Sequence, residues 1–195
     1  MSYRKTKRLF DFTLALMLLP AVSLVSIFVM IAIKADTKGS AVIRQKRVGM
    51  NSKEFVCYKF RTMKTGTPTV ARAELRDAKK HVTRVGKTLR KYGIDELPQI
   101  INVLRGEMSF VGPRPLLACE EPIHRMRSEC GIYTVPPGIT GLCQISCRDP
   151  RSAYERVALD YEYFCKKSMR YDISLLFRTV FVEKLTLDRL IKDEQ

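Results

Sequence analysis

Two adjacent acidic residues, Asp95 and Glu96, directly precede Leu97-Pro98 and offer the clearest chemistry in the chain. Pro98 opens an apolar-periodic run, and proline is favoured in a first helical turn, so this run predicts a helix. At a helix N-terminus, unpaired N–H groups and the helix dipole favour a negative group, whether a side chain or a phosphate. Neighbouring helical positions do not face each other. The two acids are therefore expected to have separate roles around one anionic group, unless Asp95 only caps the helix.

Cationic residues surround the two acids in the sequence. They are Arg84, Lys87, Arg90 and Lys91 upstream, and Arg105 and Arg114 downstream. Arg114 lies between Pro113 and Pro115, whose rings restrict the backbone of the loop. A guanidinium held in this way suits bidentate contact with a phosphate, although an exposed basic turn has the same composition. The pattern favours a site for phosphate groups.

Upstream of this stretch, alternating side chains predict two short strands over 41–45 and 55–60. A turn at 49–52 joins them, which indicates a hairpin. Lys59 and Arg61 are two positions apart and would share one face of the second strand. These two side chains are candidates to line an anionic site, while exposed strand charges are the commoner explanation.

The N-terminal part must place this site near a membrane. Residues 14–33 carry no charge and match the roughly 20 residues that a helix needs to cross the hydrocarbon core, and no cleavage site follows them. Basic residues flank the segment on both sides, which favours the cytoplasm for both ends. A straight span would place one end outside. We therefore expect a re-entrant helix bent near Pro20, with a plain transmembrane helix as the alternative.

The rest of the chain contributes less to the predicted site. Residues 64–81 are expected to form a surface insertion, and residues 120–148 form a Pro/Gly-rich connection with little helical periodicity. Helices are predicted over 152–164 and 172–191. The apolar face of the last helix fits either the membrane interface or the core of the domain.

Composition limits the classes of partner. The chain has 35 Lys and Arg against 20 Asp and Glu, a formal charge of +15, which predicts an anionic partner. The apolar segment favours a membrane and phosphates, and no nucleic-acid reading module is recognisable, so we expect no nucleic acid. The six cysteines form no CxxC pair, and the two histidines lie far apart and are not spaced with the cysteines as a ligand set. We expect reduced thiols and no structural zinc.

Several motifs together resemble the bacterial sugar transferases that move a sugar phosphate onto a polyprenyl phosphate. The motifs are KRLFD at 7–11, YKFRTM at 58–63, DELPQ at 95–99, NVLRGEMS at 102–109, GPRP at 112–115, PGITG at 137–141 and a final helix containing Asp172. They cover nearly the whole chain, whose size is similar to that of the small monotopic members. The chain departs from the family pattern at Leu24, Pro136 and Ser146-Cys147, where proline, arginine and Asn-Gly are usual. The last two departures leave the donor preference open.

The resemblance implies a phosphoglycosyl transferase that moves a sugar-1-phosphate from a UDP-sugar to undecaprenyl phosphate and releases UMP. It implies that Asp95 attacks the phosphorus bonded to the sugar and forms a covalent aspartyl-phosphosugar intermediate. Glu96 would bind Mg²⁺, with Asp95 adding to it before the attack. The candidates for phosphate and substrate contacts are Arg90, Arg114, Lys59, Arg61 and Arg105.

The predicted fold is α+β and mainly α, a single domain over 1–195. It has a membrane-embedded helix over 9–33 and a cytoplasmic catalytic part over 41–195, with a short β-hairpin and interfacial amphipathic helices. We expect the protein at the cytoplasmic face of the bacterial inner membrane, among membrane lipids, in polysaccharide or glycoconjugate synthesis, with a homo-oligomer left open. The competing hypothesis is a non-catalytic basic scaffold that gathers anionic lipid or a partner enzyme, in which Asp95 is only a cap.

Overall fold

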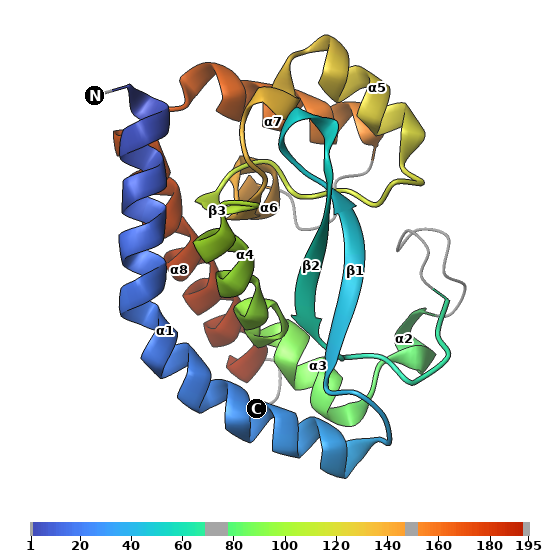
Figure 1. The fold of residues 1–195 in the computed structure, drawn as a ribbon. Coiled ribbons are helices and arrows are strands. Elements are labelled where there is room, and N and C mark those ends of the chain that lie inside the picture. The colour runs from blue at the N-terminus through green and yellow to red at the C-terminus, as the bar shows by residue number, and fades with distance from the viewer. Residues whose placement is uncertain (1, 69–77, 147–151, 193–195) are drawn as a thin grey trace.

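A long helix along one side of a small, mainly helical domain defines the architecture, seen in a computed structural model that describes residues 2–68, 78–146 and 152–192 (Figure 1). The helices are α1 (Tyr3–Asp36), α2 (Ala78–His81), α3 (Arg84–Lys91), α4 (Ile100–Arg105), α5 (Glu121–Glu129), α6 (Leu142–Ser146), α7 (Ala153–Lys166) and α8 (Met169–Lys192). The strands are β1 (Val42–Val48), β2 (Glu54–Phe60), β3 (Ser109–Val111) and β4 (Gly138–Thr140). Short 3-10 turns are η1 (Met50–Ser52), η2 (Ile94–Gln99) and η3 (Ile132–Thr134). The predicted mainly helical fold is confirmed.

Helix α1 is continuous over 34 residues, contains Pro20, and curves around the domain midway along its length (Figure 1). It is long and apolar enough to cross a membrane, with a mean hydropathy of 2.7 over its most apolar window, of which 6% is buried. Its exposed apolar side chains include Leu16, Met17, Leu24, Ile27, Phe28 and Ile31. Such a surface is unfavourable in water and suits a lipid environment.

Both ends of α1 are fastened to the same domain. Near its start, Lys7 forms a buried ion pair with Asp172 of α8, with 2.7 Å between Nζ and Oδ2. Near its end, the Asp36 carboxylate accepts a hydrogen bond from the backbone of Val85 in α3 at 3.1 Å. A straight transmembrane helix would separate its two ends by the thickness of the bilayer. The contacts therefore favour the bent, re-entrant arrangement.

The predicted hairpin is confirmed by β1 and β2, which pair antiparallel from Val42 opposite Phe60 to Val48 opposite Glu54. Strand β1 runs to residue 48, three residues beyond the expected range. Asn51 and Ser52 adopt positive φ angles of 57° in the turn. Because β1 is longer than expected, two more basic residues, Lys46 and Arg47, lie within the sheet.

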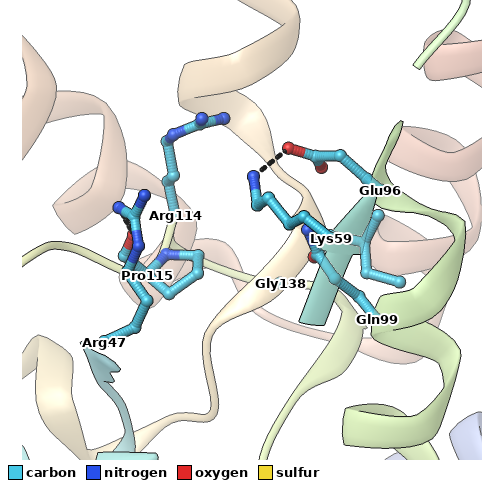
Figure 2. A pocket seen from close by; sticks show the side chains of 8 residues that line it. Arg47, Lys59, Glu96, Gln99, Arg114, Pro115 and Gly138 are labelled. Carbon is cyan, nitrogen blue, oxygen red and sulfur yellow. Dashed lines mark hydrogen bonds and ion pairs between the residues drawn. The ribbon is translucent and has the colours of Figure 1, made fainter. Parts of the chain in front are cut away.

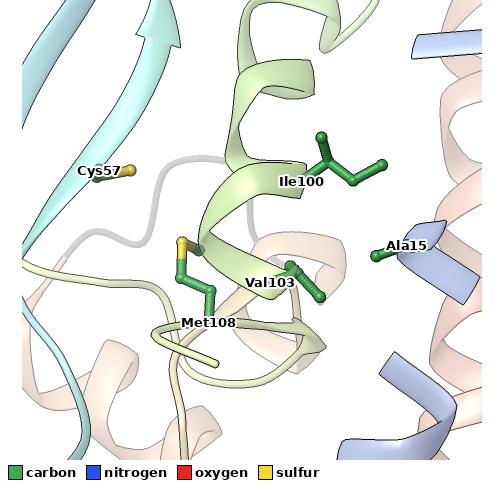
Figure 3. Packing of buried hydrophobic residues seen from close by; sticks show 5 residues of the cluster. All are labelled: Ala15, Cys57, Ile100, Val103 and Met108. Atoms are coloured by element: carbon green, nitrogen blue, oxygen red, sulfur yellow. The ribbon is translucent and has the colours of Figure 1, made fainter. Parts of the chain in front are cut away.

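Helix α4 lies between the hairpin and α1, and its apolar side chains pack on both (Figure 3). The cluster consists of Ala15, Cys57, Ile100, Val103 and Met108. Asn102 is fully buried beside it and ties α4 to β2, because its amide donates to the Val56 carbonyl at 2.7 Å and accepts from the Tyr58 N–H at 3.2 Å. These contacts fix η2, the turn that precedes α4, against the hairpin.

The prediction of a connection over residues 120–148 is wrong, since α5 and α6 lie there together with η3 and β4. Helix α5 has only a narrow apolar face, formed by Ile123 and Met126, so its periodicity is weak in the sequence. Strand β4 pairs in parallel with β3, with Ser109 opposite Gly138. A Cβ on Gly138 would lie 2.1 Å from the backbone nitrogen of Gly112, so the close approach of the two chain segments requires glycine.

The two closing helices agree with prediction. The Ser152 hydroxyl caps α7 by accepting from the Glu155 N–H at 3.1 Å. Helix α8 buries Leu175 in the domain and exposes Phe177 and Val180. It therefore contributes to the core and also presents an apolar stripe at the surface. Of the expected surface insertion over 64–81, residues 69–77 lie outside the described part.

Candidate active site

Asp95 and Glu96 lie in the first turn of η2, which begins after Gly93 in the left-handed conformation at φ 64°. The predicted helix therefore starts as a 3-10 turn and continues as α4 from Ile100. Gly93 is the N-cap of η2, and Gln99 is the N-cap of α4. Asp95 holds neither capping position, so the interpretation of this residue as a helix cap fails.

Glu96 forms an ion pair with Lys59 of β2, in which Nζ lies 2.6 Å from Oε1 (Figure 2). The side chains are 13% and 21% exposed, so solvent screens the pair only in part. Burial alone would raise the pKa of Glu96, but the positive charges of Lys59 and Arg114 outweigh it. The pKa of Glu96 therefore lies below its ordinary value, and this carboxyl is ionised at neutral pH.

The ion pair lies at one side of a small pocket (Figure 2). The lining residues are Arg47, Lys59, Glu96, Gln99, Arg114, Pro115, Gly138 and Ile139. The lining contains three cations and one carboxylate, a formal charge of +2. A pocket of this charge attracts an anion with more than one negative charge, such as a phosphate or a diphosphate.

Asp95 is half-buried next to this pocket and is not one of its lining residues. Burial raises its pKa above the ordinary value, and the negative charge of Glu96 raises it further, while Lys59 and Arg90 act in the opposite direction. The pKa values of the two acids therefore shift in opposite directions. Glu96 is a stabilised anion, whereas Asp95 is a carboxylate held at higher free energy.

Arg90 of α3 acts on the pKa of Asp95 and lies outside the pocket lining. Its Nε donates a hydrogen bond to the Thr62 hydroxyl at 2.8 Å, which orients the guanidinium. Helix α3 packs directly against the Thr62 backbone. A Cβ on Gly86 would lie 2.2 Å from the Thr62 carbonyl oxygen, so this approach requires glycine. The structure thus brings Arg90 near Asp95 and Arg114 near Glu96.

Two predicted cations are not part of this arrangement. Arg61 is buried, and its Nη2 donates to the Thr37 carbonyl at 2.8 Å, at the end of α1. Arg105 donates to the Tyr58 hydroxyl at 3.0 Å and lies over the Tyr58 ring. Tyr58 and Lys59 point to opposite faces of β2, so Arg105 lies on the side away from the pocket. These positions favour structural roles for Arg61 and Arg105.

Sequence reasoning missed Arg47, which the structure places in the pocket with Lys59 and Arg114. Arg47 pairs with Phe55 across the hairpin, in the register that puts odd-numbered residues of both strands on one face. Ending the strand at residue 45 concealed this relationship. An alternation continued to the turn at Gly49 would have placed Arg47 and Lys59 on the same face.

The described part of the chain contains no cluster of three or more Asp, Glu, His or Cys side chains that could hold a metal. Mg²⁺ does not require such a cluster, because it binds through one or two carboxylates together with substrate phosphates and water. Asp95 and Glu96 are adjacent, and the charge of Glu96 raises the pKa of Asp95, an unfavourable interaction that a cation would relieve. The donor set fits Mg²⁺.

The five described cysteines, at 57, 119, 130, 143 and 165, are free thiols, and Cys147 lies outside the described residues.

Comparison with known proteins gives a match to the family described as bacterial sugar transferase over residues 2–184. The chain is 38% identical over 190 residues to the exopolysaccharide production protein ExoY of Sinorhizobium fredii, covering 90% of this chain and 84% of that protein. It is 37% identical over 185 residues to the UDP-glucose:undecaprenyl-phosphate glucose-1-phosphate transferase of Caulobacter vibrioides, covering 89% and 68%. The Escherichia coli protein of the same name is 39% identical over 187 residues, which cover 91% of this chain and 40% of that protein.

Proposed function

Because this chain belongs to the bacterial sugar transferase family, we propose that it moves a sugar-1-phosphate from a UDP-sugar to undecaprenyl phosphate. The observation that carries the proposal is the pocket in which Lys59 and Arg114 stabilise ionised Glu96 next to the half-buried Asp95. A site with this charge binds phosphates and also supplies a carboxylate able to attack one. The product would enter polysaccharide or glycoconjugate synthesis, since the relatives include exopolysaccharide production proteins.

In the first half of the proposed reaction, a carboxylate oxygen of Asp95 attacks the phosphorus bonded to the sugar. The phosphoanhydride bond breaks, and UMP leaves with the bridging oxygen and its electron pair. The result is an acyl phosphate between Asp95 and the sugar phosphate. The raised pKa of Asp95 supports this role, because a carboxylate held at higher free energy is a better nucleophile than a fully stabilised one.

In the second half, an oxygen of undecaprenyl phosphate attacks the same phosphorus and the Asp95 carboxylate leaves. This step forms the lipid diphosphate sugar and restores the enzyme. Two displacements avoid the direct encounter of two anionic substrates. Arg114 and Arg90 would offset the charge that builds on the phosphate oxygens, each with a contribution of about 3 kcal/mol on the scale of one preorganised donor.

Glu96 and Asp95 are the residues that would hold Mg²⁺ together with the substrate phosphates. When bound, the ion neutralises phosphate charge and polarises the phosphorus toward attack. Lys59 keeps Glu96 ionised and oriented through the 2.6 Å contact, so the carboxylate is ready to bind a cation. The low pKa of Glu96 supports this role, because a metal ligand must be deprotonated.

The long apolar helix supports the proposal that the acceptor is a lipid. The two ends of α1 contact the domain that carries the pocket, and the exposed Phe177 and Val180 of α8 add apolar surface. Undecaprenyl phosphate keeps its chain in the bilayer and its phosphate at the interface. We propose that the pocket opens at the cytoplasmic face of the inner membrane, where both substrates would meet.

UMP release tests the proposal directly. Detergent-solubilised protein is incubated with Mg²⁺, undecaprenyl phosphate and a panel of UDP-sugars, beside the Asp95→Asn variant and an Asp36→Asn control. Release with one sugar, lost in Asp95→Asn and kept in Asp36→Asn, would support the enzyme and identify its donor. A radiolabelled sugar phosphate retained on wild-type protein without acceptor, and absent from Asp95→Asn, would support the covalent intermediate. Near-normal turnover by Asp95→Asn would exclude it.

A further inference from the structure

The proposed function uses Arg114, Lys59 and Glu96 and leaves one charged residue of the pocket without a task. We propose that Arg47 binds a second phosphate group of the substrates, adjacent to the phosphate that Arg114 contacts. The inference rests on the proposed function for the identity of the substrates, but the phosphate site itself depends only on the geometry of the pocket.

Arg47 is oriented entirely by neutral oxygens. Its Nε and Nη2 donate to the Gln45 side-chain oxygen at 3.2 and 2.6 Å, and its Nη1 donates to the Pro115 carbonyl at 3.1 Å. Among the ion pairs of the described residues, none involves Arg47. A carboxylate partner would cancel the charge, whereas an amide and a carbonyl fix the guanidinium in place and leave its charge available.

The available donors of Arg47 are also sufficient for a ligand. A guanidinium has five N–H donors, and the three hydrogen bonds to Gln45 and Pro115 use three of them. Two N–H groups, one on each terminal nitrogen, remain for a further acceptor. Figure 2 shows the guanidinium groups of Arg47 and Arg114 on the same side of the pocket, opposite the Lys59–Glu96 pair.

The neighbourhood of Arg114 makes an anion favourable at this position. Burial lowers the pKa of Arg47 and the positive charge of Arg114 lowers it further, while Glu120 and Glu96 act in the opposite direction. An oxyanion placed between the two arginines would relieve the repulsion. The formal charge of +2 in the lining matches the two negative charges of a diphosphate better than those of one ionised phosphodiester.

Two substrates could supply the second phosphate, the diphosphate of the UDP-sugar donor or the phosphate of the lipid acceptor. The experiment compares wild-type protein with Arg47→Gln, which removes the charge, and Arg47→Lys, which retains it. Arg44→Gln is the matched control, because Arg44 is an exposed arginine of the same strand whose loss changes the net charge equally. Calorimetry measures the binding of UDP and UMP without turnover, and steady-state kinetics give the KM for each substrate.

We expect Arg47→Gln to weaken UDP binding by about 10- to 100-fold, on the scale of a hydrogen bond to a charged group, with a smaller effect on UMP. Arg47→Lys should recover part of this loss and Arg44→Gln should match wild type. A rise in donor KM then assigns the phosphate to the UDP-sugar. A rise confined to the KM of undecaprenyl phosphate, with UDP binding unchanged, assigns it to the acceptor.

Unchanged UDP binding and unchanged KM values in Arg47→Gln, with only kcat or the unfolding temperature lowered, would overturn the inference. That result would reduce Arg47 to a support for the Pro115 loop. The outcome is separable from the failure of the proposed function. If wild-type protein released no UMP with any donor and Arg47→Gln still lost UDP affinity, the phosphate site would stand and the reaction would not.

Discussion

Arg127 holds the loop that carries Arg114, because its Nη1 donates a hydrogen bond to the Arg114 backbone carbonyl at 2.8 Å. The same guanidinium forms an ion pair with Asp160 of α7, and its Nε donates to the Asp160 carboxylate at 3.1 Å. Both side chains are almost fully buried. The pair lies outside the pocket lining and acts on the site through the position of Arg114.

Breaking this pair is expected to lower stability and catalysis together. Asp160→Asn leaves the buried Arg127 charge without its partner, so the free energy of unfolding should fall by about 3 to 5 kcal/mol. The loosened Arg114 should then lower kcat more than it raises donor KM. Unfolding in denaturant and steady-state kinetics measure the two effects.

Two variants separate positioning from general damage. Arg127→Lys retains a charge beside Asp160 and should recover part of the activity, whereas Arg125→Met, an exposed position of the same helix, should match wild type. A destabilised Asp160→Asn protein with normal kcat at a temperature where it is folded would contradict the positioning role.

Lys59 is expected to set the acid side of the pH–rate profile. Its charge lowers the pKa of Glu96 and also opposes the rise in the pKa of Asp95. In Lys59→Met both values increase, so the loss of kcat/KM on acidification should begin at a higher pH. At neutral pH the rate should fall by about 10²-fold, the scale for one lost electrostatic contact in an active site.

The stability of the protein should change in the same sense. The folded-state pKa of Glu96 lies below its unfolded value, so ionised Glu96 stabilises the fold above the unfolded pKa and this contribution is lost as pH falls through the folded value. Lys59→Met should remove that pH dependence. Lys46→Met removes an exposed lysine from the neighbouring strand and should leave both profiles in place. An unshifted profile in Lys59→Met would exclude the coupling.

The turn that carries the two acids, the hairpin and the long apolar helix were predicted from the sequence because each has a strong local pattern. Pro98 marks the turn after Asp95 and Glu96, and an uncharged segment of membrane length is hard to mistake. The parts that failed depend on contacts between distant segments. Arg61 shares the strand parity of Lys59, yet it lies just past the end of β2 and binds the carbonyls that follow α1.

Arg127 and Arg47 are the opposite case, because sequence patterns did not indicate them and the structure places them at or behind the site. Helix α5 is short and mostly polar, and its function is to carry Arg127 to Asp160 of α7, a pairing that no local pattern reveals. Arg47 could have been found from strand alternation, but its neutral partners Gln45 and Pro115 come from two separate segments. Long-range polar contacts decide which of many basic residues belong to the site.

Asn102 should be a sensitive polar position of the core outside the pocket. Its amide bridges the Val56 carbonyl, the Tyr58 N–H and the Glu107 carboxylate, and its side chain is fully buried. Asn102→Ala leaves these groups without a partner, so the free energy of unfolding should fall by about 3 kcal/mol. Ile101→Ala, on the exposed side of the same helix, should change it much less. Equal effects of the two substitutions would contradict the bridging role.

The topology of α1 gives a test that does not depend on activity. The Lys7–Asp172 pair near its start and the Asp36–Val85 contact at its end tie both ends to one domain. If that domain is cytoplasmic, cysteines placed at Ser2 and Lys38, on either side of the helix, should both be protected from a membrane-impermeant maleimide in intact cells. The exposed Cys119 and Cys165 are first replaced by serine.

After the inner membrane is opened, both introduced cysteines should react, which shows that protection came from the membrane and not from the fold. Labelling at Ser2→Cys alone in intact cells would indicate a straight span and would contradict the contact between Lys7 and Asp172. Replacing Pro20 by leucine provides a second comparison, because it restores the missing backbone donor and favours an unbent helix. If the bend depends on Pro20, that variant should shift position 2 toward external labelling while position 38 stays protected.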